Sequence, residues 1–161
     1  LIQDQFHRDE KAIGLLFAVS IAVDAPMSPL GGRWGDRRGR KGPAVAGLTI
    51  LAASVALLAV LATTLGAAFA LGLFGAGFSL SMAAAVPWLD EAFGALERGL
   101  GYGMLNLLYS AGYALGPLIG GGVLELASAD LAYLVTAALL AAGAIAVVAW
   151  ARASTTIAPS S

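Results

Sequence analysis

Residues 43–64 read PAVAGLTILAASVALLAVLATT, a stretch with no charged side chain. An α-helix rises 1.5 Å per residue, so about 20 apolar residues cross the roughly 30 Å hydrocarbon core of a bilayer. This stretch is long enough and apolar enough to do so. It therefore predicts a membrane-spanning helix.

Four further apolar stretches flank this one and are separated by short polar segments. They cover residues 12–32, 66–89, 100–124 and 131–150. The whole chain is 59% hydrophobic and 12% charged, whereas a soluble domain carries about 25% charged residues. Its mean hydropathy is +0.84. The sequence predicts an integral, multi-pass membrane protein: an all-α helix bundle with about five transmembrane helices. A soluble helical core is the alternative, but few amphipathic helices would remain to cover it.

Composition argues against several other classes. The chain has no cysteine and a net charge of −1, which excludes a disulfide scaffold and gives no electrostatic basis for nucleic-acid binding. The single histidine, His7, has no second ligand at metal spacing. No phosphate-binding loop or Ser-His-Asp set is present, so we expect neither an enzyme nor a metal site nor a cofactor.

Basic residues are distributed unevenly between the two predicted sides of the membrane. Seven of the nine lie in the segments after the first, third and fifth spans: Arg33, Arg37, Arg38, Arg40, Lys41, Arg98 and Arg152. The three tryptophans, Trp34, Trp88 and Trp150, fall at the same ends of those spans. Both features are typical of the cytoplasmic interface. We therefore predict that residues 32–42, residues 90–98 and the C-terminus are cytoplasmic.

The segment after the first span carries a specific pattern of glycine and charge. It reads GRWGDRRGRK over residues 32–41 and is predicted to form a tight, charged loop, Gly32–Gly42. The pattern resembles the G-x-x-x-D-R-x-G-R-K signature of the major facilitator superfamily, which lies between the second and third helices and again between the eighth and ninth. The matching residues are Gly32, Asp36, Arg37, Gly39, Arg40 and Lys41. Trp34 replaces the usual leucine. The resemblance implies a loop that gates alternation between inward-open and outward-open states.

A second glycine pattern lies in the fourth predicted span. It is similar to the G-x8-G-x3-G-P-x2-G-G motif of the fifth helix of the superfamily's antiporters, and a looser copy occurs in their eleventh. The matching residues are Gly103, Gly112, Gly116, Pro117, Gly120 and Gly121. Glycines four residues apart leave one helix face without side chains, so that a neighbouring helix can approach closely.

The chain is expected to be a fragment that forms one transmembrane half-domain over residues 1–161. It opens with LIQDQFHRDE, which is neither a methionine start nor a signal peptide. The third span lacks the intramembrane arginine usual in the antiporters' fourth helix, and a polar tail follows the fifth span directly. These features favour helices 8–12 of a twelve-helix transporter. The complete antiporter motif favours helices 2–6 instead.

Asp24 is the only acidic residue well inside a predicted span. It lies about 12 Å from the inner end, where an ionised carboxylate costs on the order of 3 kcal/mol. Ser20 and Ser28 lie four residues to either side, which makes one polar stripe. Asp24 is therefore a candidate for proton coupling, with the two serines lining a substrate cavity. A structural role beside Pro26 and Pro29 is the alternative.

Four polar side chains share one face of the fourth span. They are Tyr102, Asn106, Tyr109 and Tyr113, at spacings of four, three and four. Phenols and an amide suit a cavity for apolar or cationic substrates, and polar contacts between helices are the alternative. The stretch GYALGP, residues 112–117, also resembles the eleventh helix of vesicular monoamine transporters. Those transporters carry an acid where this chain has Asn106, which leaves proton coupling to Asp24 or to the other half.

The resemblance implies a secondary active transporter of the multidrug efflux type. The expected activity is proton-coupled efflux of a small organic molecule by alternating access. Its expected partners are membrane lipid, the other half of the transporter, the substrate and protons, but no nucleic acid. The alternative is a non-transporting helix module, or a truncated product that only associates with partner helices. Twelve spans need on the order of 400 residues, so this chain cannot form a complete path.

Overall fold

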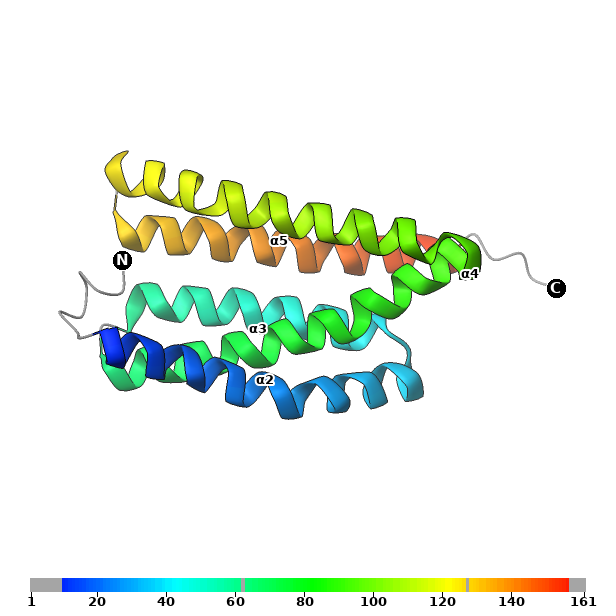
Figure 1. Ribbon diagram of the computed structural model, residues 1–161, viewed down its shortest axis with the longest axis horizontal. Helices are drawn as coiled ribbons and strands as arrows, with labels where there is room; N and C mark the ends of the chain where they lie inside the picture. The colour runs from blue at the N-terminus through cyan, green and yellow to red at the C-terminus, as the bar shows by residue number, and fades with distance from the viewer. Residues whose placement is uncertain (1–9, 62, 127, 157–161) are drawn as a thin grey trace.

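The fold is an all-α bundle, as predicted. The computed structural model describes residues 10–61, 63–126 and 128–156. These ranges contain four α-helices: α2 (Glu10–Arg38), α3 (Lys41–Val60), α4 (Thr64–Leu126) and α5 (Ala129–Thr156). Figure 1 shows the helices lying side by side along the long axis of the molecule.

Helix α4 crosses the bundle twice. It runs to one end, reverses and returns, so that it forms two arms (Figure 1). The reversal lies between Leu89 and Gly101, because an ideal Cβ on Gly101 would be 3.2 Å from a methyl group of Leu89. We call residues 64–89 the first arm and residues 101–126 the second arm. The segment 90–98, predicted as a polar separator, is instead helical, since its Ala, Leu and Glu residues favour helix.

Within the described residues, four helical segments are long and apolar enough to cross a membrane. They are Gly14–Arg38, Lys41–Val60, Thr64–Glu91 and Ala129–Ala149. The fourth predicted span, residues 100–124, corresponds to the second arm and falls outside this set. Its many glycines, three tyrosines and one asparagine reduce its hydropathy. The second arm nevertheless lies alongside the other helices in Figure 1.

The predicted loop Gly32–Gly42 is much shorter than expected. Helix α2 continues to Arg38 and α3 begins at Lys41, so only two residues join them. Arginine favours helix, and Arg37 and Arg38 complement the helix dipole at its C-terminus. Gly39 then ends the helix with a φ of +83°, a conformation that glycine adopts without strain.

The first arm of α4 packs between α2 and α3, while α5 packs against α3. Glycines allow the closest approaches. A Cβ on Gly75 would overlap the Ser20 carbonyl oxygen, and one on Gly77 would lie 2.8 Å from the Gly47 carbonyl oxygen. The Ser79 hydroxyl also donates a 3.0 Å hydrogen bond to the Asp24 carbonyl oxygen. These contacts fix α2 and α3 against the first arm and leave the second arm on the far side of a cavity.

Candidate functional site

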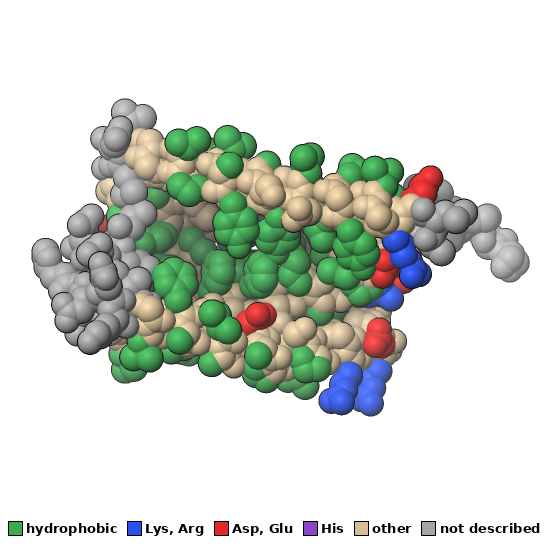
Figure 2. Space-filling model, viewed as in Figure 1, with side chains coloured by type: hydrophobic (Ala, Val, Ile, Leu, Met, Phe, Trp, Pro, Cys, Tyr) green, Lys and Arg blue, Asp and Glu red, His purple; other side chains and the backbone are tan. Residues whose placement is uncertain are grey.

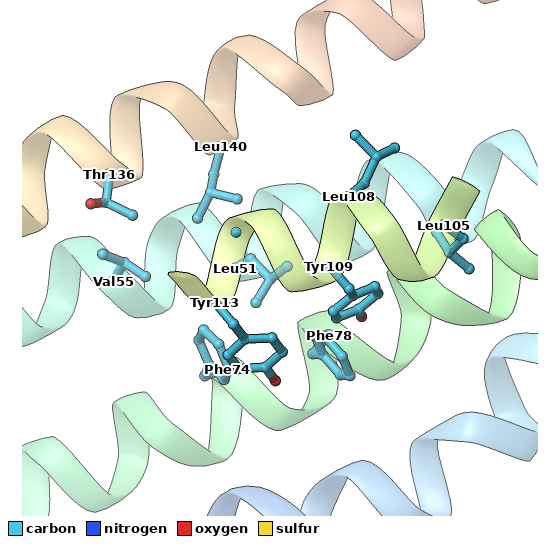
Figure 3. A pocket seen from close by; sticks show the side chains of 11 residues that line it. Leu51, Val55, Phe74, Phe78, Leu105, Leu108, Tyr109, Tyr113, Thr136 and Leu140 are labelled. Carbon is cyan, nitrogen blue, oxygen red and sulfur yellow. The ribbon is translucent and has the colours of Figure 1, made fainter. Parts of the chain in front are cut away.

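A cavity of about 660 Å³ lies between the two arms of α4. Helices α3 and α5 contribute the rest of its wall (Figure 3). The lining side chains are mainly apolar or aromatic: Leu51, Val55, Phe74, Phe78, Leu105, Leu108, Tyr109, Tyr113, Thr136 and Leu140, with Gly112 completing the wall. Cavities that hold drug-sized molecules measure about 300–1,000 Å³ and are mostly apolar with a few polar groups. This cavity has that size and that composition.

Four aromatic rings from the two arms form a continuous series in this cavity. The rings of Phe74 and Phe78 are parallel, with centroids 6.5 Å apart. Phe78 meets Tyr109 edge to face at 6.3 Å, and Tyr109 lies 6.1 Å from Tyr113. The Tyr109 hydroxyl donates a 3.1 Å hydrogen bond to Met82 Sδ on the first arm. The series thus joins the two arms and offers aromatic faces, which attract apolar groups and organic cations.

A second cavity of about 220 Å³ adjoins the first and contains Asp24. Its wall includes Ser20 and Asp24 from α2, together with three rings that also line the larger cavity: Phe74, Phe78 and Tyr113. The Asp24 side chain is partly buried. Among the described residues, no lysine or arginine lines either cavity, and Tyr113 is the other titratable residue that lines the smaller cavity with Asp24. The carboxyl group therefore lies beside the aromatic cavity without a cationic partner there.

The structure brings some of the predicted cavity residues together and leaves others apart. Tyr109 and Tyr113 line the larger cavity, and Ser20 lines the smaller one. Ser28, Tyr102 and Asn106 are exposed and are not among the described residues lining these two cavities. A substrate-cavity role for all six stays a prediction.

Sequence reasoning missed the part of the site that the first arm provides. Phe74, Phe78 and Met82 are spaced four residues apart, so they share one helix face. Phe78 and Met82 contact Tyr109, and Phe74 stacks on Phe78. That regular spacing was the available signal. Spacing alone does not mark a site here, because aromatic and sulfur-containing side chains are common in apolar spans.

The predicted gating residues lie at the end of the bundle where α4 reverses. Figure 2 shows the basic side chains of the visible face gathered at one end. A groove of about 470 Å³ there contains most of the motif and two residues of α4: Gly35, Asp36, Arg38, Gly39, Arg40, Lys41, Trp88 and Glu91. Arg40 Nη2 lies 3.1 Å from Glu91 Oε1, which connects the turn between α2 and α3 to α4. Arg98 Nε lies 3.6 Å from Asp90 Oδ1 within the reversal.

The glycines of the antiporter-like motif contact no neighbouring helix in the described part of the chain. A Cβ added at Gly103, Gly112, Gly116, Gly120 or Gly121 would have no atom within 4 Å outside its own helix turn. Pro117 lies inside the continuous helix α4. The close approaches are made instead by glycines outside the motif, Gly47, Gly75 and Gly77.

A bundle of apolar helices long enough to cross a membrane, with a cavity between its helices, is the architecture of a multi-pass membrane protein. The chain belongs to the Major Facilitator Superfamily, whose family model matches residues 1–160. The resemblance that the two motifs indicated is therefore confirmed.

Two curated relatives cover most of this chain. Multidrug resistance protein 1 of Bacillus subtilis (strain 168) is 28% identical over 127 residues, which is 79% of this chain and 33% of the relative. The vesicular acetylcholine transporter of Drosophila melanogaster is 28% identical over 137 residues, which is 84% of this chain and 24% of the relative. The chain thus spans about a third of the first relative's length and about a quarter of the second's. No solved structure matches it significantly.

Proposed function

We propose that this chain supplies one half of a transporter that exports a small organic molecule in exchange for protons, by alternating access. The single observation that carries the proposal is the aromatic cavity with Asp24 at its edge. The other half of the transporter would close the cavity. The third span lacks the intramembrane arginine usual in the antiporters' fourth helix, which favours helices 8–12 for this chain over helices 2–6.

The cavity suits a molecule that is largely apolar and has few polar groups. Its walls offer aromatic faces from both arms, together with the hydroxyl groups of Tyr109, Tyr113 and Thr136. The printed names of the two relatives refer to multidrug resistance and to acetylcholine, which is a small organic cation. Both names are consistent with such a substrate and do not specify it.

Asp24 is the group we assign to proton coupling. It lies near the middle of the candidate span Gly14–Arg38, where an ionised carboxylate without a partner is costly. When the Asp24 carboxylate binds a proton, the free-energy cost of its charge is removed. An organic cation bound nearby also reduces this cost. Proton and substrate would therefore compete for one site, which is the requirement for exchange. Tyr113 lines both cavities and is therefore the neighbour through which the two events would influence each other.

The test compares Asp24→Asn with wild type in the full-length protein reconstituted into liposomes. Ethidium, a fluorescent organic cation, serves as the probe. We expect Asp24→Asn to abolish ethidium-driven proton movement while changing equilibrium ethidium binding less, because asparagine keeps the shape and cannot exchange a proton. The matched control is Asp130→Asn, which makes the same chemical change at an exposed position in the first turn of α5.

Unchanged proton movement in Asp24→Asn would overturn the coupling role. A lower melting temperature with coupling retained would assign Asp24 a structural role beside the two prolines of α2, Pro26 and Pro29. Loss of coupling in both variants would show that the effect is not specific to Asp24.

A further inference from the structure

A second groove, about 520 Å³ in volume, lies on α2 at the charged end of the molecule and away from the aromatic cavity. Five residues line it: Leu30, Arg33, Trp34, Arg37 and Arg38. Three of the five are arginines, and none of the described lining residues is acidic. We call it the arginine groove. The family signature does not require Arg33 or Arg38, so gating does not account for this concentration of charge.

Two acidic side chains at this end of the molecule line a different groove. Asp36 and Glu91 lie in the groove of the gating motif, where Arg40 pairs with Glu91. Within the described residues, neither Arg33 nor Arg37 has an acidic partner. They lie four residues apart on α2, and like charges at that spacing destabilise a helix. An anion bound between them would offset this repulsion.

The arginine groove also has an apolar side. The Trp34 indole packs over Gly42, because an ideal Cβ there would lie 3.3 Å from the ring. This contact holds the indole beside the arginines. Leu30 lies one helical turn deeper along the membrane-spanning part of α2 and is 50% exposed. The arginines therefore lie at the end of the span, and the exposed apolar side chain of Leu30 lies next to them on the side of the membrane interior.

We propose that the arginine groove binds the phosphate headgroup of an anionic phospholipid. Arg33 and Arg37 donate hydrogen bonds to the phosphate oxygens, a geometry that the guanidinium group matches well. Arg38 supplies further positive charge at the rim. Trp34 lies at headgroup level and Leu30 contacts the acyl chain, as is typical of these residues at membrane interfaces. The proposal does not depend on the transported substrate or on proton coupling.

The test is a lipid titration of the purified, delipidated full-length protein, followed by native mass spectrometry. Phosphatidylglycerol is compared with phosphatidylcholine of the same acyl chains and with inorganic phosphate. One arginine near an anionic lipid contributes about a fivefold change in affinity. We expect Arg33→Gln to weaken phosphatidylglycerol binding by about that factor, and Arg33→Gln/Arg37→Gln by about 25-fold.

Two control variants keep the result interpretable. Arg98→Gln removes the same charge at the same end of the molecule but outside the groove, and we expect it to leave phosphatidylglycerol binding unchanged. Arg33→Lys keeps the charge and should retain more binding than Arg33→Gln. It also provides the comparison if the glutamine variants fail to fold.

Three results would overturn the proposal. Equal affinity for phosphatidylglycerol and phosphatidylcholine would show that the groove does not recognise an anionic headgroup. Displacement of the lipid by millimolar inorganic phosphate would assign the groove to free phosphate instead. Phosphatidylglycerol binding that is equally strong in wild type and in Arg33→Gln would mean that the groove is covered by another part of the protein.

Discussion

The hydroxyl of Ser79 on the first arm of α4 donates a 3.0 Å hydrogen bond to the main-chain carbonyl oxygen of Asp24 on α2. The side chain of Ser79 is almost completely buried, with 3% exposure. Pro26 and Pro29 each remove one helical hydrogen bond from this part of α2. The Ser79 hydroxyl therefore fixes the backbone at Asp24, in a part of α2 that has fewer helical hydrogen bonds of its own.

We predict that Ser79→Ala will reduce stability by about 1 kcal/mol, the usual contribution of such a hydrogen bond. Because the bond positions Asp24, proton coupling should weaken as well. Thermal unfolding in detergent and proton movement in liposomes measure the two effects. Ser54→Ala is the matched control: Ser54 is also buried, but its hydroxyl bonds to Leu51 within the same helix. A loss of coupling in Ser54→Ala equal to that in Ser79→Ala would contradict the positioning role.

The contact between α2 and the first arm of α4 should be intolerant of added volume. A methyl group at Gly75 would overlap the Ser20 carbonyl oxygen, and backbone atoms cannot yield as a flexible side chain can. We expect Gly75→Ala to reduce stability by about 1–3 kcal/mol, as overpacking generally does. Gly143→Ala on α5 is the control, because the space around Gly143 is open. Equal melting temperatures for Gly75→Ala and wild type would show that the two helices are further apart.

The gating role carried by the family signature is tested at Asp36. This side chain lies in the groove with Arg38, Arg40 and Lys41, at the end of the molecule away from the aromatic cavity. We predict that Asp36→Asn will slow transport. Equilibrium ethidium binding should stay largely intact, because Asp36 does not line the aromatic cavity. Glu97→Gln removes an exposed acidic group at the same end and should transport normally. Transport by Asp36→Asn at the wild-type rate would refute the gating role.

Membrane orientation follows from the distribution of basic residues and can be measured with an impermeant thiol reagent. The chain contains no cysteine, so a single introduced cysteine reports its own position. We predict that Glu97→Cys, at the reversal of α4, will be labelled only from the cytoplasmic side. Ser128→Cys, between α4 and α5, should be labelled from outside. Labelling of Glu97→Cys in intact cells would reverse the predicted topology.

The bundle could be predicted from the sequence because four of the apolar stretches are each long and apolar enough to indicate a membrane-spanning helix. The positions at which the helices end could not be predicted in the same way. A loop was predicted over Gly32–Gly42, but only two residues separate the helices in the structure. Charged residues and glycine indicate the edge of a membrane, but they do not require the helix to end there. The reversal of α4 likewise keeps its helical structure, because the residues that change the chain's direction are also good helix formers.

Local spacing predicted part of the candidate site and missed its long-range contacts. The face that contains Tyr109 and Tyr113 was visible as a period of four within one span. The contacts of Tyr109 with Phe78 and Met82 could not be predicted from spacing, because they depend on how the two arms of α4 pack together after the reversal. Nor does spacing alone distinguish a glycine such as Gly75, which faces another helix, from Gly116, which faces open space.

The reversal of α4 makes the second arm a lever with its fulcrum near Gly101. Tyr113 lies twelve residues along this arm, which is about 18 Å at 1.5 Å per residue. A tilt of about 10° at the fulcrum would displace Tyr113 by about 3 Å, close to the thickness of an aromatic ring. Small angular changes at the charged end of the molecule would therefore be amplified at the aromatic rings, and the width of the cavity would change from a point that no cavity-lining residue occupies.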